Sequence, residues 1–236
     1  MNLLALETST HRLSVALWRD GACLERAEEI ASGGSERLLP WVRELLDEAG
    51  MALADLDGIA FGSGPGGFTG LRLACGVAQG LACGLDLPVL GVSTLEALAL
   101  AAQRHDRDIE RVFACLDARM NEVYCAAYLI RDGVPESILA PFVAAPGMVA
   151  EVVTPHLTGE AWVGCGDGLS AYSDLLAGRL ARTIPALSPA AACVAQLAAP
   201  RLARGEGVDA ALATPLYVRD KVALTTAERL ARGGVK

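Results

Sequence analysis

The sequence predicts an α/β protein built from two similar lobes, each with a mixed β-sheet flanked by helices. Short apolar runs typical of strands alternate with helical periodicity, and the order of these elements repeats once along the chain. In each half, strand-like runs joined by hairpin signals come first, and strands separated by helices follow. The predicted unit is β-β-β-α-β-α-β-α, present twice. We assign residues 1–105 to the first lobe, 106–215 to the second and 216–236 to a C-terminal segment.

The first half gives the clearest signals for individual elements. Asp20-Gly21 is a hairpin turn signal. Ser35 can cap the start of a helix, and Gly50 can end it. The expected elements are, in order, strands 2–7, 13–18 and 23–30, helix 35–49, strand 56–61, helix 71–84, strand 88–92 and helix 94–103.

The second half repeats this order. Asp132-Gly133 matches the earlier turn signal, and 161–168 is again a strand running into a glycine turn. The other expected elements are strands 112–117, 122–130 and 138–144, helices 146–153 and 169–180, strand 183–187, helix 189–204 and a terminal helix 225–232. Two such units side by side form the architecture of actin, Hsp70 and the sugar kinases, whose lobes are RNase H-like and whose nucleotide lies between them.

A glycine-rich loop, residues 62–70, precedes the second helix of the first half. It holds five glycines and one proline, and glycine permits positive φ and close backbone approach. The helix start behind it favours anions, but a tight connection without a ligand explains the loop as well. Three glycines match the dinucleotide fingerprint, yet the loop lies too far along the chain. A Walker loop is excluded because Leu71 and Arg72 follow Gly70, where Lys and Ser or Thr are required.

Composition limits the classes of function. The 236 residues are 53% apolar and carry a net charge of -8. Proteins that hold nucleic acid alone usually have a basic face, and Lys occurs here only at Lys221 and Lys236, so a role with nucleic acid should depend on a partner.

Cysteine and histidine spacing and the hydropathy pattern indicate where the protein works. None of the seven cysteines forms CxxC, which indicates buried thiols in a cytoplasmic protein. The histidines lack metal-ligand spacing. We expect no signal peptide and no membrane span.

Five motifs along nearly the whole chain carry a resemblance to a known family. They are Leu4–Ser9, Ser35–Pro40, Gly64–Arg72, Asp117–Arg119 with Glu122–Tyr124, and Pro215–Arg219. Together they resemble the TsaB (YeaZ) family. The resemblance implies a non-catalytic subunit of the complex that adds threonylcarbamoyl to N6 of adenosine 37 in tRNA. It implies a catalytic, metal-bearing paralogue, TsaD, and an ATPase, TsaE, as partners, with ATP and a metal belonging to those partners.

The resemblance also explains why no catalytic or metal residue is expected here. The catalytic paralogue has a His-x-x-x-His pair after its fifth strand, and two imidazoles one helical turn apart can face one metal. Thr94 and Leu98 stand at the matching positions. The chain departs from the TsaB pattern at Glu7, where Asp is usual, and at Gly34, where His is frequent. The first change keeps the charge, and the second removes an imidazole before Ser35.

Several residues are expected at a cleft between the lobes, with a structural or nucleotide-adjacent role. They are Glu7, Gly64, Gly66, Thr69, Asp117 and Arg119. Glu7 should face either the cleft, where a metal could bridge it to phosphate, or water. We expect Asp117 and Arg119 to pair at the cleft with a structural role; ordinary solvation of a strand end is the alternative.

Two other functions compete with the assembly role. A small-molecule kinase or ATPase of the actin-like fold needs a base, for which Glu7 or Asp117 is available, and phosphate loops on both lobes. The hairpin at residues 7–10, however, lacks glycine. A peptidase needs a nucleophile with a nearby base, and the sequence shows none.

Two helices of the first half are expected to bind a partner. Gly76, Gly80 and Gly84 share one face of the second helix, and each glycine costs about 1 kcal/mol relative to Ala. Such a face allows close approach of another backbone, either the chain's own sheet or a partner. We expect an exposed apolar patch that binds a second copy or, exclusively, the paralogue. The expected partner-binding residues are Leu38, Trp41, Val42, Leu45, Leu73, Gly76, Val77 and Gly80.

Overall fold

The computed structural model describes residues 1–30 and 34–219, so the helix expected at 225–232 lies outside the described residues. The first half contains β1 (Asn2–Glu7), β2 (Arg12–Arg19), β3 (Ala22–Glu29), α1 (Ser35–Ala49), β4 (Gly58–Gly64), α2 (Phe68–Leu85), β5 (Val89–Ser93) and α3 (Thr94–His105). The second contains β6 (Arg111–Asp117), β7 (Val123–Arg131), β8 (Val134–Ala144), α4 (Pro146–Val153), β9 (Val163–Cys165), α5 (Gly168–Ala171), β10 (Arg182–Ile184) and α6 (Ala191–Ala203). Short 3-10 helices lie at Leu53–Asp55 and Ala210–Leu212.

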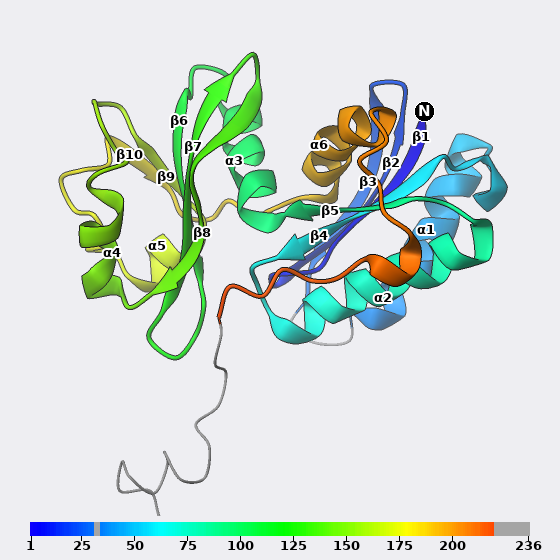
Figure 1. The fold of residues 1–236 in the computed structure, drawn as a ribbon, viewed down its shortest axis with the longest axis horizontal. Helices are drawn as coiled ribbons and strands as arrows, with labels where there is room; N and C mark the ends of the chain where they lie inside the picture. Colours follow the sequence, from blue (N-terminus) through cyan, green and yellow to red (C-terminus); the bar gives the residue numbers. More distant parts are fainter. Residues whose placement is uncertain (31–33, 220–236) are drawn as a thin grey trace, which may run out of the picture.

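Two mixed sheets organise the molecule (Figure 1). Their strand orders are β3-β2-β1-β4-β5 and β10-β9-β6-β7-β8. In each sheet the hairpin-linked strands are antiparallel and the last two strands run parallel to the first. The α/β class, the repeated β-β-β-α-β-α-β-α unit and the two tandem RNase H-like lobes are therefore confirmed. We call the body around β1–β5 lobe I and the body around β6–β10 lobe II.

Helix boundaries follow local signals at some positions. Gly50 ends α1 with a φ of 63°, as predicted. The start of α1 differs from the prediction, because Gly34 occupies the N-cap and no side chain caps the helix. The helix expected at 169–180 is also wrong, since α5 ends at Ala171. Leu176 has a φ of 58°, and this turn buries its side chain against lobe II. Tertiary burial thus overrides helical periodicity there.

The two lobes exchange helices. α6 packs on β1, β2 and β4, although residues 191–203 were assigned to the second lobe from the sequence. α3 packs mainly on β6, β7 and β8 of the other sheet, as Figure 1 also shows. Lobe I caps the foreign helix: the Ala191 N–H donates to Ser14 Oγ at 2.8 Å, and the Ala192 N–H donates to Glu25 Oε1 at 2.9 Å. The division at residue 105 therefore separates the two sheets but not the two packed bodies.

α2 is the one helix among the described residues with the length and apolar composition of a membrane span. One face of α2, formed by Ala74, Cys75, Ala78 and Ala82, is buried in the core of lobe I. The structure thus uses α2 as a packed helix of a lobe, and nothing indicates a membrane protein.

Candidate functional site

A cleft of about 600 Å³ lies between the lobes. Its lobe I wall is the turn after β1, residues 8–11, together with the loop and first turn of α2, residues 66–71. Its lobe II wall includes residues 116–119 and Asp167, and the segment 216–219 also lines it. The strand ends and the glycine loop thus meet at one place, as the fold class predicts.

The loop glycines allow two backbone segments of lobe I to touch. A Cβ on Gly66 would lie 2.6 Å from the Ser9 carbonyl oxygen, and one on Gly70 would overlap the Thr8 carbonyl oxygen. The Gly67 N–H donates to the Ser9 carbonyl at 2.7 Å, and Thr8 Oγ1 donates to the Gly70 carbonyl at 2.6 Å. Close packing of the loop on the β1 turn therefore explains these glycines without a ligand.

Glu7 lies beneath the cleft rather than in it. Its side chain is 0% exposed, so the expectation that it faces the cleft or water is wrong. Its Oε1 accepts the Ser9 N–H at 2.7 Å, while Oε2 and the hydroxyls of Ser9 and Thr94 have no hydrogen-bond partner among the described residues. Burial raises the pKa of Glu7, and the hydrogen bonds from Ser9 oppose this rise. The carboxyl is thus driven toward its neutral, protonated form, which can donate a hydrogen bond.

Gly64 is likewise displaced from its expected place. It has a φ of +121°, and a Cβ there would lie 2.8 Å from the Leu216 carbonyl oxygen. Gly64 therefore serves the C-terminal segment that crosses behind it, whereas Gly66 and Thr69 do line the cleft.

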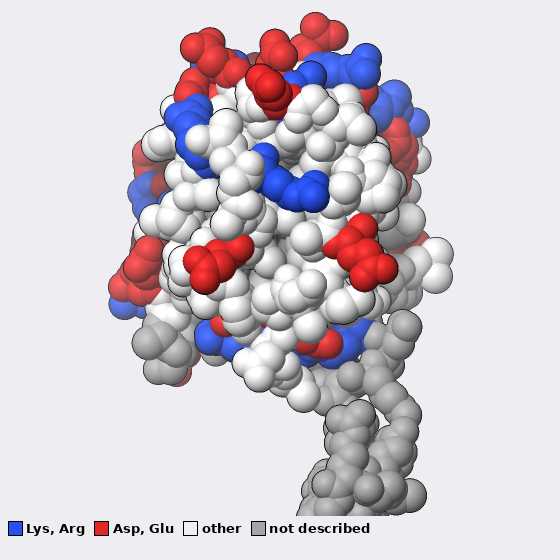
Figure 2. Space-filling model, turned by 90° about the vertical axis from the view of Figure 1, so that its left-hand side faces the viewer, with Lys and Arg blue, Asp and Glu red and all other residues white. Residues whose placement is uncertain are grey.

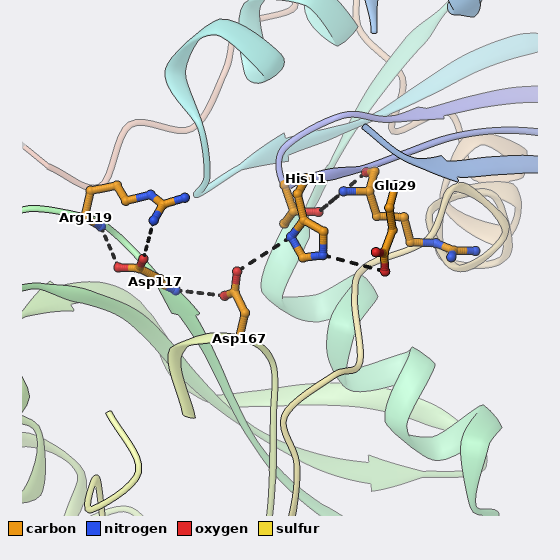
Figure 3. Close-up of polar contacts among 7 residues, drawn as sticks. His11, Glu29, Asp117, Arg119 and Asp167 are labelled. Carbon is orange, nitrogen blue, oxygen red and sulfur yellow. Dashed lines mark hydrogen bonds and ion pairs between the residues drawn. The ribbon is translucent and has the colours of Figure 1, made fainter. Parts of the chain in front are cut away.

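Asp117 and Arg119 lie in the cleft and pair, in agreement with their expected position (Figure 3). Arg119 Nη1 is 3.0 Å from Asp117 Oδ2, and the Arg119 N–H donates to Asp117 Oδ1 at 2.8 Å. The Asp117 N–H donates to Asp167 Oδ1 at 2.9 Å, which ties the ends of β6 and β9 together.

The sequence gave no indication that His11 and Asp167 would meet. His11 Nδ1, from lobe I, lies 3.9 Å from Asp167 Oδ2 in lobe II, and His11 Nε2 lies 3.9 Å from Glu29 Oε1 (Figure 3). The available signal was the position of Asp167 in the glycine turn that repeats the loop of the first half. His11 carried no signal, because its partners are distant in sequence.

The cleft chemistry favours order over catalysis. Asp117 and Asp167 both accept backbone N–H groups, and Arg119 is bound by Asp117. Across residues 1–30 and 34–219, no three His, Cys, Asp or Glu side chains are placed to hold one metal ion. Thr94 and Leu98, at the positions of the paralogue's histidines, are fully buried.

The expected partner surface is only partly present. Leu38, Trp41, Val42 and Leu45 are 0%, 8%, 3% and 0% exposed and pack in the core of lobe I, so the expectation that α1 presents them to a partner is wrong. The apolar stripe of α1 is used entirely by the fold.

The outer face of α2, in contrast, is open. A Cβ on Gly76, Gly80 or Gly84 would meet nothing within 4 Å, and Leu73 and Val77 beside them are half-buried. The chain's own sheet is therefore not what these glycines approach.

The lobes and the cleft define a two-lobed α/β protein of the actin, Hsp70 and sugar-kinase type. Residues 28–226 match the family model described as TsaD: tRNA N6-adenosine threonylcarbamoyltransferase. The chain is 40% identical over 227 residues to the tRNA threonylcarbamoyladenosine biosynthesis protein TsaB of Escherichia coli K12, covering 94% of this chain and 96% of that protein. The chain belongs to the TsaB (YeaZ) family.

Further relatives agree with this assignment. TsaB of Haemophilus influenzae is 36% identical over 228 residues, covering 94% of this chain and 95% of that protein. The solved structure of YeaZ from Pseudomonas aeruginosa superposes with a TM-score of 0.84 at 45% identity, covering 92% of this chain and 99% of that one. The resemblance seen in the five sequence motifs is therefore confirmed.

Proposed function

We propose that this chain is a non-catalytic assembly subunit of the complex that adds threonylcarbamoyl to N6 of adenosine 37 in tRNA. The outer face of α2 carries the proposal. Gly76, Gly80 and Gly84 face open space there, although a glycine inside a helix costs about 1 kcal/mol relative to Ala. Close approach of a second helix to this face accounts for that cost. A TsaD-like, metal-bearing paralogue is the proposed partner.

The cleft supports a non-catalytic role. Its lobe II carboxylates are engaged by N–H groups and an arginine of the same chain, and Glu7 is buried beneath it. The buried Thr94 and Leu98 provide no imidazole for a metal. Catalysis, ATP and metal chemistry are therefore proposed to belong to the TsaD-like and TsaE-like subunits of a cytoplasmic complex.

Contact with tRNA is proposed to occur through the complex. The chain has a net charge of -8, and the face of lobe II in Figure 2 carries acidic and basic residues in scattered positions rather than a continuous basic surface. Phosphate contacts by Lys and Arg dominate nucleic-acid affinity. This face offers few of them without a partner.

The same surface of α2 is proposed to form a two-fold homodimer when the paralogue is absent. Leu73 and Val77 flank the glycines and supply apolar area beside the close approach. Because one face would serve both associations, homodimer and heterodimer should exclude each other.

Substitution of Gly80 tests this surface. Gly80→Leu places a bulky side chain in the open space of the outer face, so the fold should persist while both associations weaken. Gly147→Leu is a matched control, because Gly147 is a helical glycine of α4 in lobe II, also with nothing within 4 Å. Mass is measured by light scattering, and capture of a purified TsaD-like paralogue is measured in parallel. Undiminished capture by Gly80→Leu would refute the surface.

The non-catalytic role is tested separately by reconstitution. The chain alone should neither hydrolyse ATP nor modify tRNA, and modification should appear when the paralogue and the ATPase are added. Threonylcarbamoylation by this chain without a paralogue, or sustained ATP turnover by it, would overturn the proposal.

A further inference from the structure

The segment 213–219, which we call the strap, runs from α2 to lobe II (Figure 1, orange to red). At its start, the Ala213 carbonyl accepts hydrogen bonds from Gln79 Nε2 at 3.0 Å and from Cys75 Sγ at 3.5 Å, both on α2. The Leu216 N–H then donates to the Ser63 carbonyl at 2.7 Å, at the end of β4. The first half of the strap is thus fixed to lobe I.

An aromatic and basic stack holds the middle of the strap to the start of α2. Arg72 Nε donates to Tyr217 Oη at 3.1 Å, and the Arg72 guanidinium lies 3.8 Å from the centroid of the Phe68 ring. The Phe68 and Tyr217 rings are 6.1 Å apart. Cation–π and ring contacts of this kind stabilise an exposed segment without burying it.

The end of the strap binds lobe II. Arg219 Nη2 donates to the Ala118 carbonyl at 3.0 Å and forms an ion pair with Glu122. The guanidinium also lies 5.7 Å from the centroid of the Tyr124 ring. The Arg219 side chain is 14% exposed, so its ion pair is less screened by water than the surface pairs elsewhere on the molecule.

The turn that Arg219 binds has an uncommon backbone. Arg119, Met120 and Asn121 have consecutive φ values of 59°, 56° and 57°, a left-handed conformation that non-glycine residues rarely adopt. The Ala118 N–H donates to the Glu122 carbonyl at 3.0 Å and closes the turn. Arg219 contacts both of these closing residues, so it braces the turn from outside.

We propose that the strap is an interlobe latch, in which Arg219 of a segment fixed to lobe I binds the 118–122 turn of lobe II and sets the width of the cleft. The other cross-cleft contact on the page, His11 with Asp167 at 3.9 Å, joins half-exposed side chains and holds the lobes less firmly. Because the strap begins on α2, the latch links the outer helix of lobe I to the far wall of the cleft.

Hydrogen–deuterium exchange of the chain alone tests the latch. Arg219→Ala should speed exchange roughly tenfold in the 118–122 turn, the size expected for loss of a charged hydrogen bond. It should also speed exchange in residues 66–71 and 8–11, the lobe I wall, which Arg219 does not bind. This second change separates a latch from a purely local brace. Small-angle scattering should show a larger radius of gyration.

Two further variants keep the test decisive. Arg131→Ala removes an exposed ion pair with Glu136 at 2.9 Å inside lobe II and should leave the cleft unchanged. The charge swap Arg219→Glu with Glu122→Arg should restore much of the protection lost in either single variant. If Arg219→Ala folds and changes only the 118–122 turn, or changes nothing, the latch is refuted. Since no partner protein enters the experiment, its failure leaves the proposed assembly role untouched.

Discussion

Replacing Gly62 with Ala tests how the buried carboxyl of Glu7 is accommodated. Gly62 lies on β4, beside β1 in the middle of the lobe I sheet. A Cβ at this position would lie 2.6 Å from Glu7 Cδ and overlap Oε2. The carboxyl has little freedom to retreat, because its side chain is fully buried and Oε1 accepts the Ser9 N–H at 2.7 Å.

The expected loss follows from two effects. Overpacking in a core costs about 1–3 kcal/mol. Displacing the carboxyl from the Ser9 N–H leaves buried polar groups unpaired, at about 1–3 kcal/mol. The sum, about 2–5 kcal/mol, is a large part of a typical total stability of about 5–15 kcal/mol. In a chain of this size the melting temperature of Gly62→Ala should fall by roughly 4–20 °C.

A double-mutant cycle identifies the cause. In a Glu7→Asp background the shorter side chain leaves room for the methyl group, so Gly62→Ala should cost less there, by about 1 kcal/mol or more. Gly76→Ala is the matched control, since its Cβ meets nothing within 4 Å, and it should stabilise the protein by about 1 kcal/mol. Thermal melts followed by circular dichroism give all four corners. Equal losses in both backgrounds would refute the clash with Glu7.

Two further predictions concern buried side chains of lobe I. Because burial raises the pKa of Glu7 above its ordinary value of 4.5, the stability due to its protonated form is complete below that value and is lost as pH rises through the raised pKa. Glu7→Gln should remove this pH dependence and stabilise the protein at pH 8 relative to wild type, as measured by urea unfolding from pH 5 to 8; an unchanged pH profile would contradict it. Trp41→Glu should lower overall stability by about 3–5 kcal/mol rather than remove partner binding selectively, because Trp41 is 8% exposed in the core. A variant that melts like wild type but fails to bind the paralogue would show that Trp41 acts at the interface.

The site could be predicted where it depends on strand ends. Asp117 and Arg119 follow a strand of the repeated unit, and the carboxyl ends of such strands face the cleft in this fold class. Contacts between distant segments were not predictable. Arg219 was visible only as part of a motif, and its binding to Glu122 requires the strap to cross from one lobe to the other.

Helical periodicity also left one question open that packing answered. The apolar residues of α1 and the glycines of α2 could each belong to a core or to an interface. The structure buries Leu38 and Leu45 of α1 fully and leaves Gly80 of α2 open to solvent. Periodicity identifies which residues share a face but not what that face meets.

The sequence by itself determined the repeated element order, the α/β class and the family, because these depend on local periodicity, turn chemistry and contiguous motifs. Only the tertiary structure decided that α3 and α6 exchange lobes and that Glu7 is buried beneath the cleft. It also decided that the left-handed 118–122 turn is held by Arg219. These features arise from burial and pairing between residues far apart in the chain, where the energy lies in long-range contacts that local patterns do not encode.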